Sequence, residues 1–161
     1  MADTKIRLAT MDDYEAICRL YRQADQHHVD LLPQVFQAFP GPARSREFVS
    51  QFVGQDGAAC IVAEADGKVV GLVSVKKAAT PPYPMFRPRE HALVEVLVVD
   101  EAHRHTGVGS LLLDAAKQWA RARGLRSLQT NVWAANRVAK RLYARHGFKT
   151  ITERIEFSFE P

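Results

Sequence analysis

Two glycines follow a polar stretch at a predicted helix start, and this arrangement is suited to binding an anion. Residues 96–112 run from apolar residues through a polar loop to Gly107, Gly109 and a segment with helical apolar spacing. The first amides of an α-helix have no carbonyl partner inside the helix, and the helix dipole places roughly half a positive charge there. Glycine has no side chain that would keep a phosphate from these amides. We therefore expect a phosphate site formed by the amides of His105, Thr106, Gly107, Val108, Gly109 and Ser110.

Three kinds of phosphate-binding loop could contain these glycines. A P-loop needs a lysine after its last glycine, whereas Ser110 follows Gly109 directly, so this interpretation fails. A dinucleotide fingerprint needs three glycines close to the end of a strand, but Leu112 stands at the third position and a polar loop intervenes. The third kind has the pattern Arg/Gln-x-x-Gly-x-Gly/Ala of acyl-coenzyme A sites, and Arg104, Gly107 and Gly109 match it.

A second segment agrees with the third interpretation. The pattern Asn-x-x-Ala-x-x-Leu-Tyr-x-x-x-Gly-Phe begins at Asn136 and ends at Phe148. In this order and spacing, the two motifs resemble those of the GCN5-related N-acetyltransferase (GNAT) superfamily, and the resemblance extends over about residues 58–159. Two positions depart from the common pattern, because His105 stands where many members have glycine and Glu101 where many have proline. The minimal motif survives both changes, but they put the conformation of the loop in question.

The resemblance implies a fold and a cosubstrate. The fold is α/β (α+β), with a mixed, largely antiparallel central sheet of about six to seven strands, splayed central strands and about four helices. A single acyl-CoA N-acyltransferase domain would occupy residues 1–161. Acetyl-CoA would serve as the acyl donor, and no metal is expected.

The resemblance also assigns contacts to the coenzyme. Its pantetheine arm would pair like an added strand with the main chain of Leu97, Val98 and Val99, where the strand splays from its neighbour. A strand amide such as that of Val98 could polarise the thioester carbonyl. Arg104 would support the loop or the phosphates, the alternative being a solvated surface side chain. Asn136 would contact the coenzyme in addition to capping a helix.

Tyr143, in the second motif, is the candidate general acid. Attack of an amine on a thioester expels a thiolate, and a phenol nearby can hydrogen-bond or protonate that sulfur. The resemblance favours this role. The alternative is a half-buried aromatic side chain on an amphipathic helix.

Glu95 is the candidate general base, and it is the only charged residue within 92–99. A buried unpaired carboxylate is costly, and an amine with a pKa of about 10.4 must lose a proton before it attacks. Some small polyamine-type family members carry glutamate at this position and follow it with aspartate, whereas Val96 follows here. The alternative is a carboxylate paired with an arginine such as Arg87 or Arg89.

The elements that position these residues follow from apolar spacing and turn residues. Asp66 and Gly67 between two apolar runs predict a hairpin, and four prolines make residues 79–90 irregular. We expect strands at 5–10, 58–64, 69–75, 92–99, 125–132 and 148–159. We expect a first helix whose buried face contains Ile17, Leu20, Tyr21 and Ala24. We expect three further helices at 46–53, 108–123 and 136–146.

Composition excludes several classes of protein. With 161 residues, 47% hydrophobic and 25% charged, the chain has the composition of one soluble globular domain. The sequence has no apolar run near the roughly 20 residues of a membrane span and no signal-peptide pattern, so we expect a cytoplasmic protein without a membrane partner. Cys18 and Cys60 are expected to be buried thiols. The net charge of +4 leaves a nucleic-acid-binding domain as a rival, but no recognition motif supports it, and we expect no nucleic-acid partner.

The acceptor is the least defined part of the expected site. It should lie between the first helices and residues 79–90, where arginines suit a carboxylate and aspartate or aromatics suit an amine. These side chains are Tyr21, His27, His28, Asp30, Phe36, Tyr83, Phe86, Arg87 and Arg89. A small primary amine is the first hypothesis, and a peptide N-terminus or lysine side chain the second. Further alternatives are a non-catalytic coenzyme-binding regulatory domain and an acyltransferase for longer acyl groups. A homodimer is a habit of the family that no residue here indicates.

Overall fold

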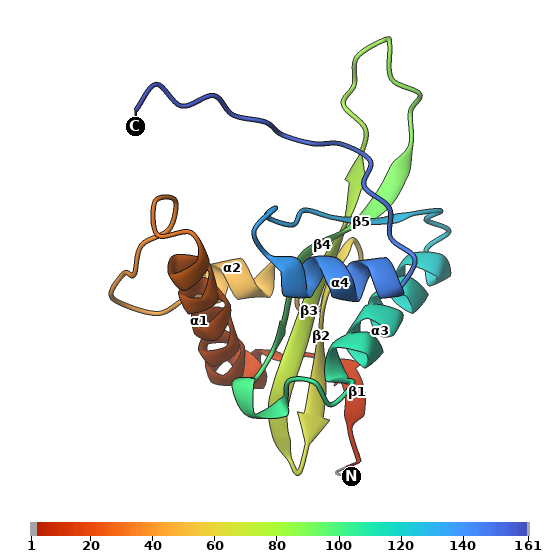
Figure 1. Cartoon of the computed structure of the whole chain (residues 1–161). Coiled ribbons are helices and arrows are strands. Elements are labelled where there is room, and N and C mark those ends of the chain that lie inside the picture. The colour runs from red at the N-terminus through yellow and green to blue at the C-terminus, as the bar shows by residue number, and fades with distance from the viewer. Residues whose placement is uncertain (1–2, 161) are drawn as a thin grey trace. The chain divides into compact units, whose positions relative to one another are not determined.

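The computed structural model of the chain describes residues 3–160. These residues fall into two compact units that divide after Asn131. The first unit is built on a five-stranded sheet with the order β1-β2-β3-β4-β5 (Figure 1). Its strands are β1 Lys5–Leu8, β2 Ala58–Ala65, β3 Lys68–Ala79, β4 Glu90–Val99 and β5 Leu128–Thr130. Its helices are α1 Tyr14–Leu31, α2 Arg46–Ser50 and α3 Val108–Ala122, with short 3-10 turns η1 Met11–Asp13 and η2 Glu101–His103.

The first four strands are antiparallel to their neighbours, and only β4 and β5 are parallel. The hairpin between β2 and β3 turns at Asp66 and Gly67, whose φ angles are 50° and 72°. Two successive positive φ angles are what a type I′ hairpin turn requires. The hairpin predicted from Asp66 and Gly67 is therefore confirmed, and these two residues form its turn.

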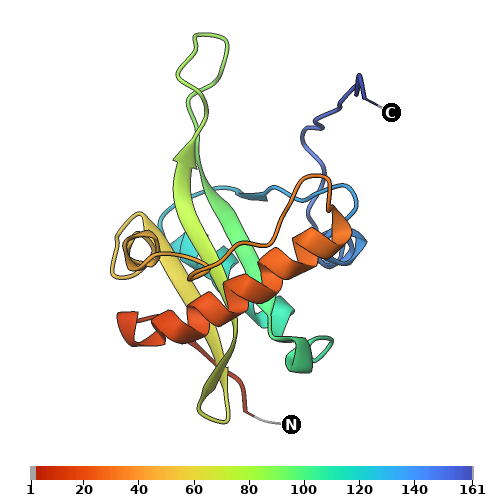
Figure 2. The same cartoon turned by 90° about the vertical axis from the view of Figure 1, so that its left-hand side faces the viewer.

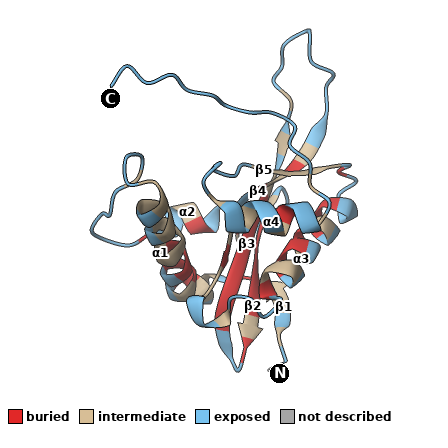
Figure 3. Ribbon diagram, in the orientation of Figure 1, coloured by how far each residue is buried: buried red, intermediate tan, exposed pale blue. Residues whose placement is uncertain are grey.

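The two faces of the sheet carry separate apolar clusters, because side chains alternate along each strand. On β2, Ala59, Ile61 and Ala63 pack in the cluster that includes α3, while Cys60 and Val62 pack in the cluster that includes α1 and α2. Figure 2 shows α1 crossing its face of the sheet, and Figure 3 shows that β2 and β3 are the most buried strands. Both cysteines, Cys18 and Cys60, are buried free thiols as expected.

β3 and β4 are longer than predicted, because their ladder continues to Ala79 opposite Glu90. The prolines are confined to the tip of this hairpin at 80–89, which projects beyond the rest of the sheet (Figure 1). Within the tip, Thr80 donates from its amide to the carbonyl oxygen of Arg89 at 2.9 Å. The irregular segment is therefore confined to residues 80–89, and it connects the two strands of a long hairpin.

The second unit contains α4, Arg137–Arg145, followed by an extended segment. The prediction of a strand at 148–159 is wrong, because residues 148–160 form no ladder. Their apolar side chains alternate with polar ones as in a strand, yet Ile155 is 90% exposed and Phe159 is 95% exposed. The described chain therefore has five strands, not the predicted six to seven. No helix between residues 3 and 160 is long and apolar enough to cross a membrane.

Candidate functional site

One edge of β4 is unpaired over the second half of the strand. The parallel ladder between β4 and β5 ends at Val94 opposite Thr130, which is the last residue of β5. On its other side, β4 stays paired with β3 until it ends at Val99. Among the strands of the described chain, none pairs with this side of β4 from Glu95 to Val99. The resemblance implied a splay of the central strands, and this part of β4 is where the ladder between β4 and β5 ends.

The register determines which main-chain groups point to the unpaired edge. The Asp100 amide donates to the carbonyl oxygen of Val70, which extends the β3–β4 ladder, at 2.8 Å. Hydrogen-bonded and non-hydrogen-bonded pairs alternate along an antiparallel ladder. Counting back from Asp100, Val98 directs its N–H and C=O toward β3, whereas Leu97 and Val99 direct theirs away from it. Of the three residues predicted to pair with a ligand arm, Leu97 and Val99 therefore have main-chain groups on the unpaired edge.

Glu95 lies in a β-bulge at the start of this edge. Val94 and Val96 are opposite consecutive residues of β3, so Glu95 between them has no opposite residue. Bulges re-aim side chains and are frequent beside active sites. The Glu95 side chain is 34% exposed, and its Oε1 forms an ion pair with Nζ of Lys76 on β3. The carboxylate is thus neither buried nor unpaired, and its recorded partner is a lysine instead of an arginine.

The loop after β4 combines a 3-10 turn with two left-handed residues. Arg104 is exposed, and its Nε donates to the Val99 carbonyl oxygen at 3.3 Å, so it supports the loop from within. His105 has a φ of 62° and Gly107 a φ of 92°. Glycine adopts this region freely, whereas a residue with a Cβ atom is strained in it. His105 stands at the position where many family members have glycine. Its backbone is left-handed, and this conformation is strained for a residue with a Cβ atom.

Replacing His105 with glycine should relieve this strain. An L-residue in the left-handed region costs roughly 1–2 kcal/mol, part of which is offset because glycine is more disordered in the unfolded chain. We expect His105→Gly to raise the melting temperature by about 2–4 °C, which corresponds to about 1 kcal/mol in a chain of this size. Thermal unfolding checks this, with Ala102→Gly as a control that should lower stability because Ala102 has no left-handed φ to relieve. A lower melting temperature for His105→Gly would contradict the proposed strain.

The start of α3 has the features of an anion site. Gly107 is the N-cap residue, so no side chain of that residue accepts from the first amides of the helix. The first turn contains no acidic residue that would repel an anion. Val108 is buried, while Thr106 is exposed and Ser110 is half-buried. The residues predicted from the glycine spacing are therefore brought together at one helix start.

Gly71 on β3 contributes to this site, and sequence reasoning did not find it. A Cβ atom there would lie 3.0 Å from Cδ1 of Leu112, 3.2 Å from Cγ1 of Val108 and 3.2 Å from the Val98 carbonyl oxygen. The first turns of α3 thus rest on β3 where the strand has no side chain. A glycine inside a strand is a signal for close approach, but the partner could not be known from the sequence.

Filling the space above Gly71 should displace the start of α3. Overpacking a core typically costs about 1–3 kcal/mol, so we expect Gly71→Val to lower the melting temperature by several degrees. Because Val108 and Leu112 lie in the first turns of α3, which form the candidate anion site, stabilisation by a phosphate-bearing ligand should fall too. Gly57→Val is the matched control, since a Cβ at Gly57 meets nothing within 4 Å. Equal melting temperatures for the two variants would show that α3 is not held by this contact.

Of the side chains expected around the acceptor, Tyr21 is buried and Tyr83 is exposed. Tyr21 is 4% exposed, and its hydroxyl shares a hydrogen bond of 3.0 Å with buried Ser74 Oγ. Burial raises the pKa of Tyr21 to about 12, so this phenol stays protonated near neutral pH. The ring of His28 stacks on Phe36 with centroids 5.0 Å apart, while Tyr83 is exposed on the projecting hairpin. Tyr21 is therefore a structural residue and not part of an open acceptor site.

The second unit holds Asn136 and Tyr143. Asn136 caps α4, because its Oδ1 accepts from the Ala139 amide at 3.1 Å. The helix ends in a Schellman motif, in which the Phe148 amide donates to the Tyr143 carbonyl oxygen at 3.0 Å and Gly147 has a φ of 82°. The buried ring of Tyr143 lies 5.2 Å from that of Phe148. The second motif thus encodes a helix with both of its ends.

The first unit has two cavities. One of about 540 Å³ is lined by residues of β1, η1, α1 and the β2–β3 turn, together with Asp100 and His103 of the loop after β4. The other, of about 370 Å³, is lined mainly by residues 52–55, which follow α2, by β2 and by the β1–η1 connection. Neither is lined by Glu95, Leu97 or Val99. In this unit, the candidate site is therefore the open edge of β4 together with the loop and the start of α3.

Comparison with known sequences gives one family and two relatives. The sequence model of the Acetyltransferase (GNAT) family matches residues 25–148. One relative is YwnH of Bacillus subtilis (strain 168), which is provisionally named a phosphinothricin acetyltransferase. It is 29% identical over 146 residues, and the alignment covers 89% of this chain and 82% of YwnH. Streptothricin acetyltransferase of Escherichia coli is 28% identical over 103 residues, 64% of this chain and 54% of that enzyme.

Solved structures share the fold. A mutant form of the BH1408 protein of Bacillus halodurans has a TM-score of 0.90 at 24% identity, with 96% of this chain and 99% of that chain covered. Aminoglycoside N-acetyltransferase AAC(6′)-Iy in complex with CoA has a TM-score of 0.75 at 20% identity, with 99% and 96% covered. At these identities, the likeness is evidence for the fold. Because the family's sequence model spans most of the chain, including β4, the loop and the start of α3, this chain belongs to the GNAT family of acetyltransferases.

Proposed function

We propose that the protein transfers an acetyl group from acetyl-CoA to the nitrogen of a small primary amine. The observation that carries this proposal is the edge of β4, unpaired from Glu95 to Val99, which continues through the loop into the N-terminus of α3. An unpaired strand edge can take an amide-bearing arm as an added strand, and a helix start can take a diphosphate. Coenzyme A carries these two groups in one molecule.

In the proposed reaction, the amine nitrogen attacks the thioester carbonyl carbon, the carbon–sulfur bond breaks, and an amide and a free thiol are formed. Glu95 takes the proton that the amine must lose, directly or through water, and Tyr143 donates a proton to the leaving sulfur. The Leu97 amide polarises the carbonyl. We assign this role to Leu97 and not to Val98, because the register turns Val98 toward β3. Holding the reactants together supplies several kcal/mol more.

The coenzyme contacts follow the same division of the chain. The amides of 105–110 hold the diphosphate, Leu97 and Val99 pair with the pantetheine arm, and Asn136 adds a contact from the second unit. We propose that both units belong to one acyltransferase domain spanning residues 1–161. The family match from 25 to 148 supports this, because it crosses the boundary between the units at 131. Two buried thiols support a cytoplasmic location.

The relatives favour a small acceptor over a peptide. Their names refer to phosphinothricin and streptothricin acetyltransferases, and a structural neighbour is an aminoglycoside N-acetyltransferase. A peptide N-terminus or lysine side chain is the second candidate. A non-catalytic coenzyme-binding domain is the third, and it differs from the first two in having no turnover.

Thermal unfolding with acetyl-CoA, desulfo-CoA and NAD tests the proposal first. A ligand at 100 times its dissociation constant adds about 2.7 kcal/mol of stability, so both coenzyme A species should raise the melting temperature by several degrees. NAD should not. Thiol release is then measured with phosphinothricin, streptothricin, an aminoglycoside and a lysine peptide. Stabilisation without thiol release from any amine would favour the non-catalytic domain, and no stabilisation at millimolar coenzyme would contradict the proposal.

A further inference from the structure

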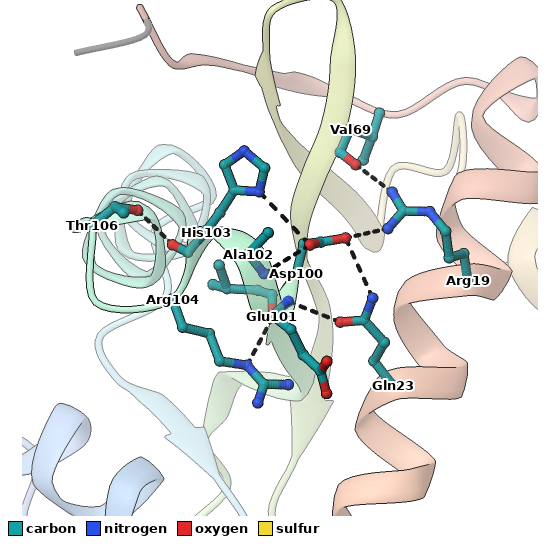
Figure 4. A network of polar contacts seen from close by, with 10 residues as sticks. Arg19, Gln23, Val69, Asp100, Glu101, Ala102, His103, Arg104 and Thr106 are labelled. Atoms are coloured by element: carbon teal, nitrogen blue, oxygen red, sulfur yellow. Dashed lines mark hydrogen bonds and ion pairs between the residues drawn. The ribbon is translucent and has the colours of Figure 1, made fainter.

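Asp100, the residue after β4, is the centre of a polar network that the proposed reaction does not use (Figure 4). Its amide donates to the Val70 carbonyl oxygen at 2.8 Å, and its Oδ1 accepts from the Ala102 amide at 3.1 Å. The side chain is 16% exposed. Burial by itself would raise the pKa of Asp100, but hydrogen bonds from Ala102, Arg19 and Gln23 hold this pKa below its usual value. The carboxylate is therefore ionised at neutral pH.

α1 contributes the other half of the network. Arg19 and Gln23 are four residues apart and therefore share one face of the helix. Arg19 forms an ion pair with Asp100 and donates from Nη2 to the Val69 carbonyl oxygen at 2.7 Å. Gln23 donates from Nε2 to Asp100 Oδ2 at 3.3 Å, and its Oε1 accepts from the Glu101 amide at 3.0 Å. Two side chains of α1 thus hold two consecutive loop residues and the adjoining strand.

The network fixes the upstream end of the loop whose downstream end is Gly107. In the 3-10 turn, the His103 amide donates to the Asp100 carbonyl oxygen at 2.9 Å, and the Arg104 amide donates to that of Glu101 at 3.4 Å. The path of the chain into the left-handed residues therefore depends on where Asp100 and Glu101 are held.

We propose that Asp100, held by Arg19 and Gln23, is a positioning residue that keeps the loop in the conformation that binds the diphosphate of the acyl donor. This inference rests on the proposed function, because it concerns the same loop. A loop that is already ordered in the free protein loses less conformational entropy when a ligand binds. The ligand therefore binds with higher affinity. Binding residues need such support from the residues behind them.

The test compares two acetyl donors that differ in the diphosphate. Gln23→Ala and Asp100→Asn are assayed with acetyl-CoA and with S-acetylpantetheine, which lacks the diphosphate and the nucleotide. We expect kcat/KM for acetyl-CoA to fall about tenfold through KM, with kcat nearly unchanged, because the loop loses hydrogen bonds that order it before the donor binds. Activity with S-acetylpantetheine should not change. Calorimetric titration with desulfo-CoA should show about the same tenfold loss of affinity without requiring turnover.

Gln26→Ala is the matched control, because Gln26 Nε2 donates to Asp30 Oδ1 within α1, at 2.8 Å. It should leave both donors and desulfo-CoA affinity unchanged. Equal losses with both donors, or unchanged desulfo-CoA affinity in Gln23→Ala and Asp100→Asn, would overturn the inference while leaving the proposed function intact. A wild-type protein that binds no desulfo-CoA and releases no thiol would instead overturn the proposed function, and this inference with it.

Discussion

Replacing Glu95 with glutamine is expected to lower kcat/KM for the amine about 100-fold near neutral pH, because general-base catalysis typically contributes about 10²–10⁴-fold. Glutamine keeps the size of the side chain in the bulge but cannot accept the proton. The rate would then follow the fraction of acceptor that is already a neutral amine. That fraction rises with pH toward the pKa of the amine, about 10.4 for a lysine-like acceptor. The pH optimum should therefore move upward, and pH–rate profiles of the two proteins check this.

A second cross-strand ion pair provides the control. Lys77 and Glu90 pair across the same two strands, with Nζ and Oε1 2.9 Å apart, near the projecting hairpin tip. Glu90→Gln removes an ion pair of the same kind away from the bulge, and it should leave the pH–rate profile unchanged. If Glu95→Gln also leaves the profile unchanged, Glu95 serves only to pair with Lys76, and the base is another group or water.

Local signals predicted the elements whose ends are set by nearby residues. The Asp-Gly turn gave the β2–β3 hairpin, and the second motif gave α4, because Asn136 and Gly147 are its two caps. The strand predicted at 148–159 failed for a different reason. Alternating apolar residues show only that a segment could lie on a sheet, and a strand also needs a partner. No strand of the described chain pairs with that segment.

The candidate site divides in the same way. Gly107 and Gly109 were predicted to lie at a helix start, and Gly107 is the N-cap of α3, because a helix start is encoded locally in the sequence. The bulge at Glu95, the ion pair with Lys76 and the Asp100 network could not be predicted. Each depends on register or on packing between residues far apart in the chain.

Replacing Tyr143 with phenylalanine is expected to lower kcat about 100-fold while leaving the KM for acetyl-CoA nearly unchanged, because the group that donates a proton to the leaving sulfur is lost. Phenylalanine keeps the ring that lies 5.2 Å from Phe148 and the Schellman motif that ends α4. The change therefore removes a hydroxyl without removing a packing contact. Steady-state kinetics with varied acetyl-CoA, together with desulfo-CoA titration, separate kcat from affinity.

Phe148→Leu tests the packing role of the same pair. It weakens the ring contact with Tyr143 but keeps the hydroxyl, so it should lower the melting temperature by a few degrees and change kcat little. A lower kcat in Tyr143→Phe and a lower melting temperature in Phe148→Leu would separate two roles of the motif. Phe148 would then stabilise the end of the helix, and the Tyr143 hydroxyl would act on the thiol. If Tyr143→Phe lowered kcat and coenzyme affinity equally, the hydroxyl would act in binding or packing. The proton for the leaving sulfur would then have to come from solvent or from the amine itself.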